Sequence, residues 1–221
     1  MRIGYVVDIH GAFERVPEAL AQIGDVDLLI VGGDITTGGT PDEAERAVAS
    51  WRELAPRLLA LAGNMDSREI DARLAEIGVA LDGRGITFGH VGVFGVSAAP
   101  LSPLRTPYEL ADDELEQRIR RGFAAVERCR VAIFCPHAPP AQTACDRLAG
   151  GEHVGSPVIR AFVERRQPDL VLCGHIHEAR AVDRVGRSQI VNPGPVSAGH
   201  YAVVDVDDGV TVALDNTAGA L

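Results

Sequence analysis

Residue types that bind metal ions recur along this chain of 221 residues, each time just after a short apolar run. In chain order they are Asp8, His10, Asp34, Asn64, His137, His175 and His177. In open α/β sheets, ligands bind at the carboxyl ends of the strands, so residues that follow separate strands can meet at one place. Imidazole and carboxylate together suit Mn, Fe, Co, Zn or Ni. The pattern therefore predicts one metal centre assembled from five strand ends.

The ligand types fit a centre with two divalent or trivalent metal ions. One carboxylate can bridge two cations that lie about 3.5–4 Å apart, the separation typical of two-metal hydrolases. Asp34 is the natural bridge, because it is the lone carboxylate between two groups of ligands. Glycines beside the ligands, such as Gly33 and Gly63, would let the backbone turn tightly and approach closely.

Each motif also has a simpler interpretation. Gly63-Asn64 is a turn signal in its own right, and Asp8-Ile9-His10 is a common tripeptide pattern. A single histidine after a strand, such as His137, is usually a satisfied polar residue. Five such elements, each after an apolar strand, are hard to obtain as unrelated turns, so the joint pattern favours the metal centre.

The elements that must position these residues alternate between strand and helix patterns. Thr40, Pro41 and Glu43 form a capping-box signature that opens a helix, whose apolar face is expected to extend to Leu54. The first part of the chain reads βαβαβα, and its end is mainly β. This order predicts an α/β sandwich with a largely parallel sheet in a single domain over residues 1–221. Strands are expected at 2–7, 27–31, 58–61, 130–135, 169–173, 188–191, 201–206 and 210–215, and a β-rich segment interrupted by glycines at 86–96. Helices are expected at 12–23, 67–77, 112–128 and from Ser156. Residues 98–107 are expected to be a loop, and residues 136–152 an irregular stretch.

The composition restricts the function classes. The formal net charge is −10, and no basic stripe is visible, which argues against long nucleic acid and anionic membranes as partners. Bound cations could still reverse the field locally for a small phosphate ester. Only four cysteines are present and none forms a C-x-x-C pair, while no apolar run approaches the ~18 residues of a membrane span. We therefore expect a cytoplasmic protein without membrane attachment, with oligomerisation left open.

The ordered motifs resemble those of the calcineurin-like metallophosphoesterases. They are Asp-x-His at Asp8, Gly-Asp at Asp34, Gly-Asn-x-Asp at Asn64, the lone His137, and Gly-His-x-His at His175. The later Asn192-Pro193-Gly194 is similar to the small prokaryotic members. The resemblance implies a four-layer α/β/β/α sandwich with two mixed β-sheets. It also implies that Asp8, His10 and His177 hold one metal, that Asn64, His137 and His175 hold the other, and that Asp34 bridges.

The resemblance also implies two-metal-dependent hydrolysis of a phosphate ester by a metal-bridging hydroxide. The chain departs from the family at Met65, where many members carry a histidine that protonates the leaving group. Either His153 serves as proton donor instead, or the leaving group needs none, or the protein mainly binds. For His153, a surface loop position is the competing interpretation. Asp66 is expected to support the site by orienting a ligand or by capping the following helix.

A small phosphodiester is the preferred substrate, and a phosphomonoester is the alternative. A nuclease of the same family should show a basic or aromatic groove, yet aromatic residues make up only 5% of the chain. A metal-binding interaction scaffold on the same fold is the alternative outside the enzymes. All seven ligand positions carry competent residue types, which favours the enzyme.

Overall fold

The first of two large sheets contains the strands nearest the N-terminus and the C-terminus. The computed structural model describes residues 1–217. In this sheet β1 pairs in parallel with β2, β2 pairs in parallel with β3, and β12 pairs antiparallel with both β1 and β13. In order across the sheet, the strands are β13 (Val210–Asn216), β12 (His200–Val206), β1 (Arg2–Val6), β2 (Leu28–Val31) and β3 (Leu58–Ala60).

The second sheet is also mixed. Its four central strands run parallel to one another, and an antiparallel strand closes each edge. In order, the strands are β10 (Ala181–Val185), β11 (Ser188–Asn192), β9 (Leu170–Leu172), β8 (Val131–Pro136), β5 (Val91–Val96) and β4 (Gly85–Phe88).

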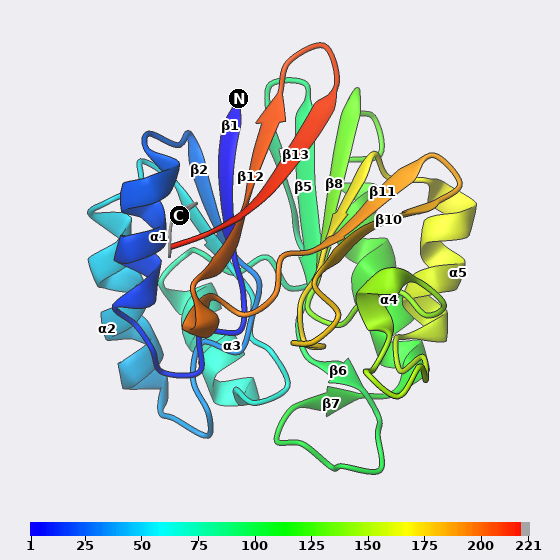
Figure 1. The fold of residues 1–221 in the computed structure, drawn as a ribbon, viewed down its shortest axis with the longest axis horizontal. Helices are drawn as coiled ribbons and strands as arrows, with labels where there is room; N and C mark the ends of the chain where they lie inside the picture. The colour runs from blue at the N-terminus through cyan, green and yellow to red at the C-terminus, as the bar shows by residue number, and fades with distance from the viewer. Residues whose placement is uncertain (218–221) are drawn as a thin grey trace.

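Helices cover the outer face of each sheet, and an apolar layer fills the space between the sheets (Figure 1). Helices α1 (Arg15–Ile23) and α2 (Pro41–Arg52) lie on the side of the first sheet, where α3 (Arg68–Glu76) packs against α2. Helices α4 (Asp112–Ala124) and α5 (Pro157–Arg166) cover the second sheet. The predicted four-layer α/β/β/α sandwich with two mixed sheets is confirmed.

Local sequence signals explain several of these boundaries. The predicted capping box is present at the start of α2, where the Thr40 side chain accepts from the Glu43 amide and Glu43 accepts from the Thr40 amide. The prediction that Leu54 faces the core is wrong: α2 ends at Arg52, and Leu54 is 52% exposed. A helix that stops one turn early turns its next apolar residue away from the core.

Three further predictions needed correction. Helix α4 ends at Ala124, earlier than the predicted residue 128. The predicted loop 98–107 contains β6 (Ala99–Pro100), which pairs with β7 (Glu109–Leu110). Strand β10 was not predicted, because it is an edge strand with charged residues, and this pattern weakens the apolar signal. Among the described residues, no helix is long and apolar enough to span a membrane.

Candidate metal centre

The parallel strands of both sheets end at one edge of the molecule, and the predicted metal ligands lie on the loops beyond them. The loops after β1 and β2 lie at the lower end of the first sheet in Figure 1. The seven predicted residues follow β1, β2, β3, β8 and β9. Hydrogen bonds and short contacts connect all seven, so the structure brings the whole predicted set together.

Asp8, His10 and His177 form one part of the cluster, and each offers one ligand atom within 4.8 Å of the others. The Nε2 atoms of His10 and His177 are 3.0 Å apart, and Asp8 Oδ2 lies 3.9 Å from His177 Nε2. His10 Nδ1 lies 2.9 Å from the Thr37 hydroxyl, which leaves Nε2 facing the centre. Two nitrogens that face each other at this distance are well placed to share a cation.

Asn64, His137 and His175 form the second part. Asn64 Oδ1 lies 3.0 Å from His137 Nε2 and 2.6 Å from His175 Nδ1. His137 Nδ1 donates to the Gly32 carbonyl at 3.0 Å, so its Nε2 faces the cluster. A backbone carbonyl on the second ring nitrogen is the usual way in which proteins orient a metal-binding imidazole.

Asp34 lies between the two parts. Its Oδ2 atom is 3.6 Å from His10 Nε2 and 3.5 Å from His137 Nε2, one nitrogen from each part. Its Oδ1 accepts from the Met65 amide at 2.7 Å, which fixes the carboxylate plane. Asp8 also approaches both parts, since it forms a second compact group with Asp34 and His137. The donor set therefore fits two adjacent cations with a shared carboxylate.

The electrostatics of the metal-free centre is uneven. Burial lowers the pKa of His10 and His177, and it lowers the pKa of His175 to about 4. These three rings are neutral near pH 7 and have lone pairs to offer. His137 differs from these three. Burial lowers its pKa, but the nearby Asp34 and Asp8 outweigh burial and raise the pKa to about 9.

The two buried carboxylates respond in opposite directions. Burial and the charge of Asp34 raise the pKa of Asp8 to about 7, although His137 and the His175 amide lower it. For Asp34, burial acts to raise the pKa, but His137 and the Met65 amide outweigh it, so the pKa is lowered. At neutral pH Asp34 thus carries the charge that keeps His137 protonated.

The backbone is strained at the same place. Asp8, His10, Asp34 and His175 adopt positive φ angles of 57°, 51°, 49° and 67°. Such conformations are costly for non-glycine residues and concentrate at functional sites. The neighbouring Gly63 has no room for a side chain, because a Cβ atom there would overlap the Asp34 carboxylate.

Asp66 lies beneath the ligands. Its carboxylate accepts from the amides of Ile35, Thr36 and Gly63 at 2.8–2.9 Å and from the Thr36 hydroxyl. It therefore ties the loop of Asp34 to the loop of Asn64. The alternative prediction of helix capping is wrong, since Ser67 caps α3.

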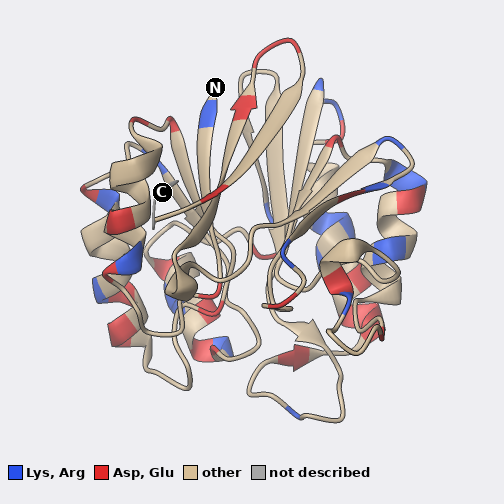
Figure 2. Cartoon of the chain, in the orientation of Figure 1, with Lys and Arg blue, Asp and Glu red and all other residues tan. Residues whose placement is uncertain are grey.

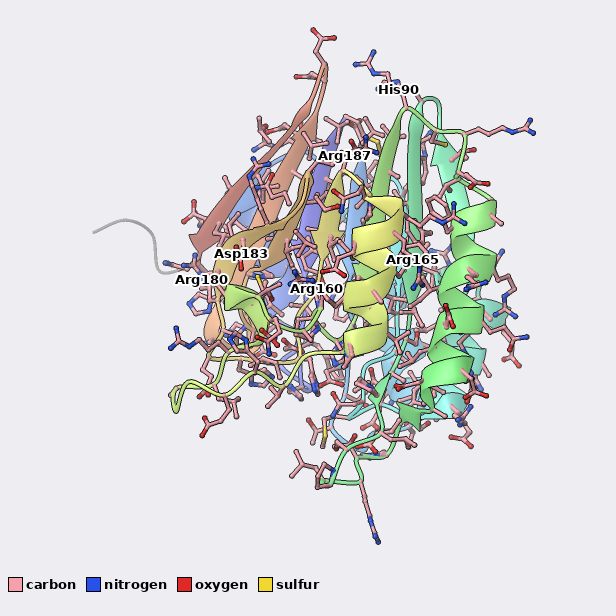
Figure 3. All side chains as sticks on the ribbon, turned by 90° about the vertical axis from the view of Figure 1, so that its right-hand side faces the viewer. His90, Arg160, Arg165, Arg180, Asp183 and Arg187 are labelled. Carbon is pink, nitrogen blue, oxygen red and sulfur yellow. The ribbon has the colours of Figure 1, made fainter. Side chains whose placement is uncertain are left out.

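His153 lies apart from the seven residues. Its Nδ1 is 2.7 Å from the buried Asp146, and no hydrogen bond or ion pair joins it to a predicted ligand within residues 1–217. With Glu178, which directly follows His177, it lines a cavity of about 550 Å³. Two other lining residues, Arg180 and Asp183, are labelled in Figure 3. A role for His153 as proton donor stays a prediction.

The groups that orient the candidate ligands and His153 were not predicted from the sequence. Thr37 contacts His10, the Gly32 carbonyl contacts His137, and Asp146 holds His153. A backbone carbonyl leaves no trace in the residue type. Thr37 and Asp146 follow no motif, so only their contacts in the folded chain reveal them.

The four-layer α/β/β/α sandwich carries His, Asp and Asn side chains at the shared edge of its sheets. The chain is therefore an α/β sandwich protein with a candidate metal centre. The chain belongs to the calcineurin-like phosphoesterase family, whose pattern matches residues 1–179.

Two relatives are similar in sequence over most of this chain. An uncharacterized protein of Methanocaldococcus jannaschii is 30% identical over 220 residues, covering 97% of this chain and 96% of that protein. A probable cyclic nucleotide phosphodiesterase of Synechococcus sp. is 29% identical over 174 residues, covering 74% of this chain and 64% of that protein.

Two solved structures share the fold. A protein of Thermus thermophilus has a TM-score of 0.77 at 17% identity, with 98% of each chain covered. A dimetal phosphatase from Danio rerio has a TM-score of 0.67 at 11% identity, with 98% of this chain and 96% of that chain covered.

Proposed function

We propose that this protein is a two-metal-dependent phosphoesterase that hydrolyses a small phosphodiester. The observation that carries the proposal is the position of Asp34, whose Oδ2 lies 3.5–3.6 Å from one imidazole nitrogen of each part of the centre. A carboxylate with this arrangement suits a bridge between two cations. Membership in the phosphoesterase family supports the reaction class.

The residues divide into two binding positions. Asp8, His10 and His177 would hold the first ion, and Asn64, His137 and His175 would hold the second, with Asp34 shared. When bound, such ions activate water at neutral pH and neutralise charge on phosphoryl oxygens. Mixed imidazole and carboxylate ligands fit Mn, Fe, Zn, Co or Ni.

The chain supplies binding and orientation. His10, His175 and His177 are neutral near pH 7, so no proton has to leave them before they bind a cation. Asp66 holds the loops of Asp34 and Asn64 at a fixed separation through four hydrogen bonds. Preorganised ligands of this kind spare the protein a rearrangement on binding.

Several observations favour a small substrate. The relative in Synechococcus sp. carries the description of a cyclic nucleotide phosphodiesterase, and a cyclic nucleotide is a small phosphodiester. Acidic and basic residues alternate over the helices in Figure 2, and the chain carries a net charge of −10, which disfavours long nucleic acid. We keep a cytoplasmic location as a prediction from the small number of cysteines.

We further propose His153 as the proton donor that Met65 cannot be. Asp146 is fully buried and accepts the His153 Nδ1 proton, which fixes the ring and leaves Nε2 without a hydrogen-bond partner among the described residues. A buried carboxylate that orients an imidazole is a recurring arrangement in acid–base catalysis. The cavity beside Glu178 would receive the leaving group.

Hydrolysis of paired aryl phosphate monoesters and diesters tests the proposal. Purified protein is reconstituted with Mn²⁺ and compared with Asp34→Ala and with Asp208→Ala, whose carboxylate is fully exposed in the β12–β13 hairpin. We expect turnover of the diester, loss of turnover to background in Asp34→Ala, and unchanged turnover in Asp208→Ala. Preference for the monoester would make the protein a phosphatase, and two bound ions without any turnover would favour the binding scaffold.

A further inference from the structure

Five polar residues, two of them buried and three partly buried, lie behind the loop that carries Asn64 and belong to no part of the metal centre. They are Asp71 on α3, Asp82 before β4, Ser97 after β5, Tyr108 before β7 and Arg118 on α4, and we call them the Ser97–Arg118 network. Ser97 and Tyr108 are 0% and 1% exposed, and the side chains of the three charged members are 10–16% exposed. Buried polar groups of this kind must satisfy one another.

Hydrogen bonds close the network into a ring. Asp71 accepts from the Ser97 hydroxyl at 2.8 Å and from the Tyr108 hydroxyl at 2.9 Å. Arg118 Nη1 donates to the Tyr108 hydroxyl at 2.8 Å and to Asp82 at 2.7 Å. Asp82 in turn accepts from the Ser97 amide at 2.9 Å. The removal of one member therefore takes one hydrogen-bond partner from each of its two neighbours in the ring.

The network holds the backbone on both sides of Asn64. The Ala62 amide donates to the Ser97 hydroxyl at 3.1 Å, and the Tyr108 amide donates to the Asn64 carbonyl at 3.0 Å. Between these two contacts, the Gly63 amide donates to Asp66. The peptide units that set the direction of the Asn64 side chain are thus bound to fixed groups.

We propose that the Ser97–Arg118 network positions Asn64 and thereby sets the affinity of the second metal position, made by Asn64, His137 and His175. The inference rests on the proposed function, since metal binding by these three residues is part of it. Asn64 Oδ1 lies within 3.0 Å of a nitrogen of both histidines, so a small displacement of its loop alters both contacts together. Asp8, His10 and His177 lie on other loops, and within residues 1–217 no hydrogen bond or ion pair joins them to the network.

A cavity of about 540 Å³ between α3 and α4 borders Asp71, Tyr108 and Arg118. Water can enter from this side and satisfy groups that a substitution leaves unpaired. We therefore expect variants of the network to fold.

Tyr108→Phe is the first test, because it removes one hydroxyl and keeps the ring. Calorimetric titration of the metal-free protein with Mn²⁺ should give two ions for the wild type. In the variant we expect one ion to be weakened by about tenfold or more, in line with the effect of residues that support metal ligands, and the other to stay within about twofold. In electron paramagnetic resonance, the signal of a coupled Mn²⁺ pair at two equivalents should give way to that of isolated ions.

Tyr201→Phe is the matched control, since the Tyr201 side chain is buried and its hydroxyl has no hydrogen bond among the described residues. Ser97→Ala is the second variant, and it should weaken the same ion as Tyr108→Phe. If the wild type binds fewer than two ions, the proposed function itself fails. If the wild type binds two and both variants retain both affinities, or weaken the two ions equally, the positioning role is refuted. Should thermal melting show that Tyr108→Phe is unfolded, Ser97→Ala decides.

Discussion

Metal binding is predicted to release a proton from His137 at neutral pH. The ring is fully buried, and burial lowers its pKa, but Asp34 at 3.5 Å and Asp8 raise it to about 9. In the metal-free protein at pH 7 the imidazole is therefore protonated. A histidine must be neutral to bind a metal ion, so binding and deprotonation are linked.

The size of the effect follows from this pKa. Below the pKa of His137, the fraction of neutral imidazole rises about tenfold with each unit of pH, and the metal affinity rises with it. From pH 7 to about pH 9, the affinity should therefore rise by roughly 100-fold, or about 2.7 kcal/mol, from His137 alone. His175 contributes nothing to this rise, because its pKa of about 4 leaves it neutral throughout the range. Above about pH 9 the dependence from His137 should flatten.

The same pKa gives the stability of the metal-free protein a defined pH dependence. Because the folded-state pKa of His137 is raised above the ordinary 6.5, its protonation stabilises the fold fully below about pH 6.5. That contribution is lost as the pH rises through about 9. Asp8, with a pKa raised to about 7, acts in the same direction, with its loss complete near neutral pH.

Two measurements check the prediction. Calorimetric titration with Mn²⁺ at pH 7, in buffers of different ionisation enthalpy, should show release of at least one proton per protein. Nuclear magnetic resonance of the imidazole nitrogens in the metal-free protein should then show His137 protonated at pH 7 and His175 neutral.

Asp34→Asn provides the matched variant, since it keeps the shape and removes the charge. Without that charge, the pKa of His137 should fall, because burial lowers it and only Asp8 and the Gly32 carbonyl remain to raise it. Asp146→Asn, at a carboxylate that contacts His153 instead, should leave His137 unchanged. A neutral His137 in the wild type at pH 7, or an unchanged His137 in Asp34→Asn, would refute the reasoning.

Two further predictions concern the proposed proton donor and the helical layer over the second sheet. His153→Gln should slow hydrolysis of an alkyl phosphodiester by about 10²–10⁴-fold but that of a nitrophenyl diester by less than about tenfold, because only the poor leaving group needs an acid; equal effects in steady-state assays would exclude the role. Phe162→Ala should cost about 3–5 kcal/mol in urea unfolding, because Phe162 is buried against Phe94, Phe123 and Phe134, and a loss below about 1 kcal/mol would contradict this packing.

The sequence predicted that the seven candidate metal ligands lie close together in the fold, because two physical signals coincide at these positions. An apolar run such as Leu28–Val31 predicts a buried strand, and the residues just beyond it must lie at the strand's end. When several such ends carry ligand types, parallel pairing alone brings them to one edge. Strands β1 and β2 show this alignment, because they pair in parallel with Ile3 opposite Leu28 and Val6 opposite Val31.

The supporting groups could not be predicted in the same way. Ser97 and Tyr108 contact the Asn64 loop only because β5 and the β6–β7 segment pass behind it, and this proximity arises from packing of distant segments. Asp66 was noticed because it stands beside Asn64, yet its partners Ile35 and Thr36 lie on another loop. Local propensity contains no information on such pairings.

Backbone strain and the burial of charged groups make the candidate metal centre a destabilising part of the fold. Four of the seven candidate ligands have left-handed backbone conformations, which cost of order 1–3 kcal/mol each. Asp8 is buried as well, and its pKa is raised to about 7 mainly because burial disfavours the charged carboxylate, with a smaller contribution from the charge of Asp34. Backbone hydrogen bonds to Asp66 and to the Ser97–Arg118 network act against these costs. Bound cations would remove the repulsion between Asp8 and Asp34, so the arrangement favours a function with bound metal ions over a metal-free one. The proposed enzyme and the metal-binding scaffold both satisfy this condition, and turnover of an aryl phosphodiester is what distinguishes them.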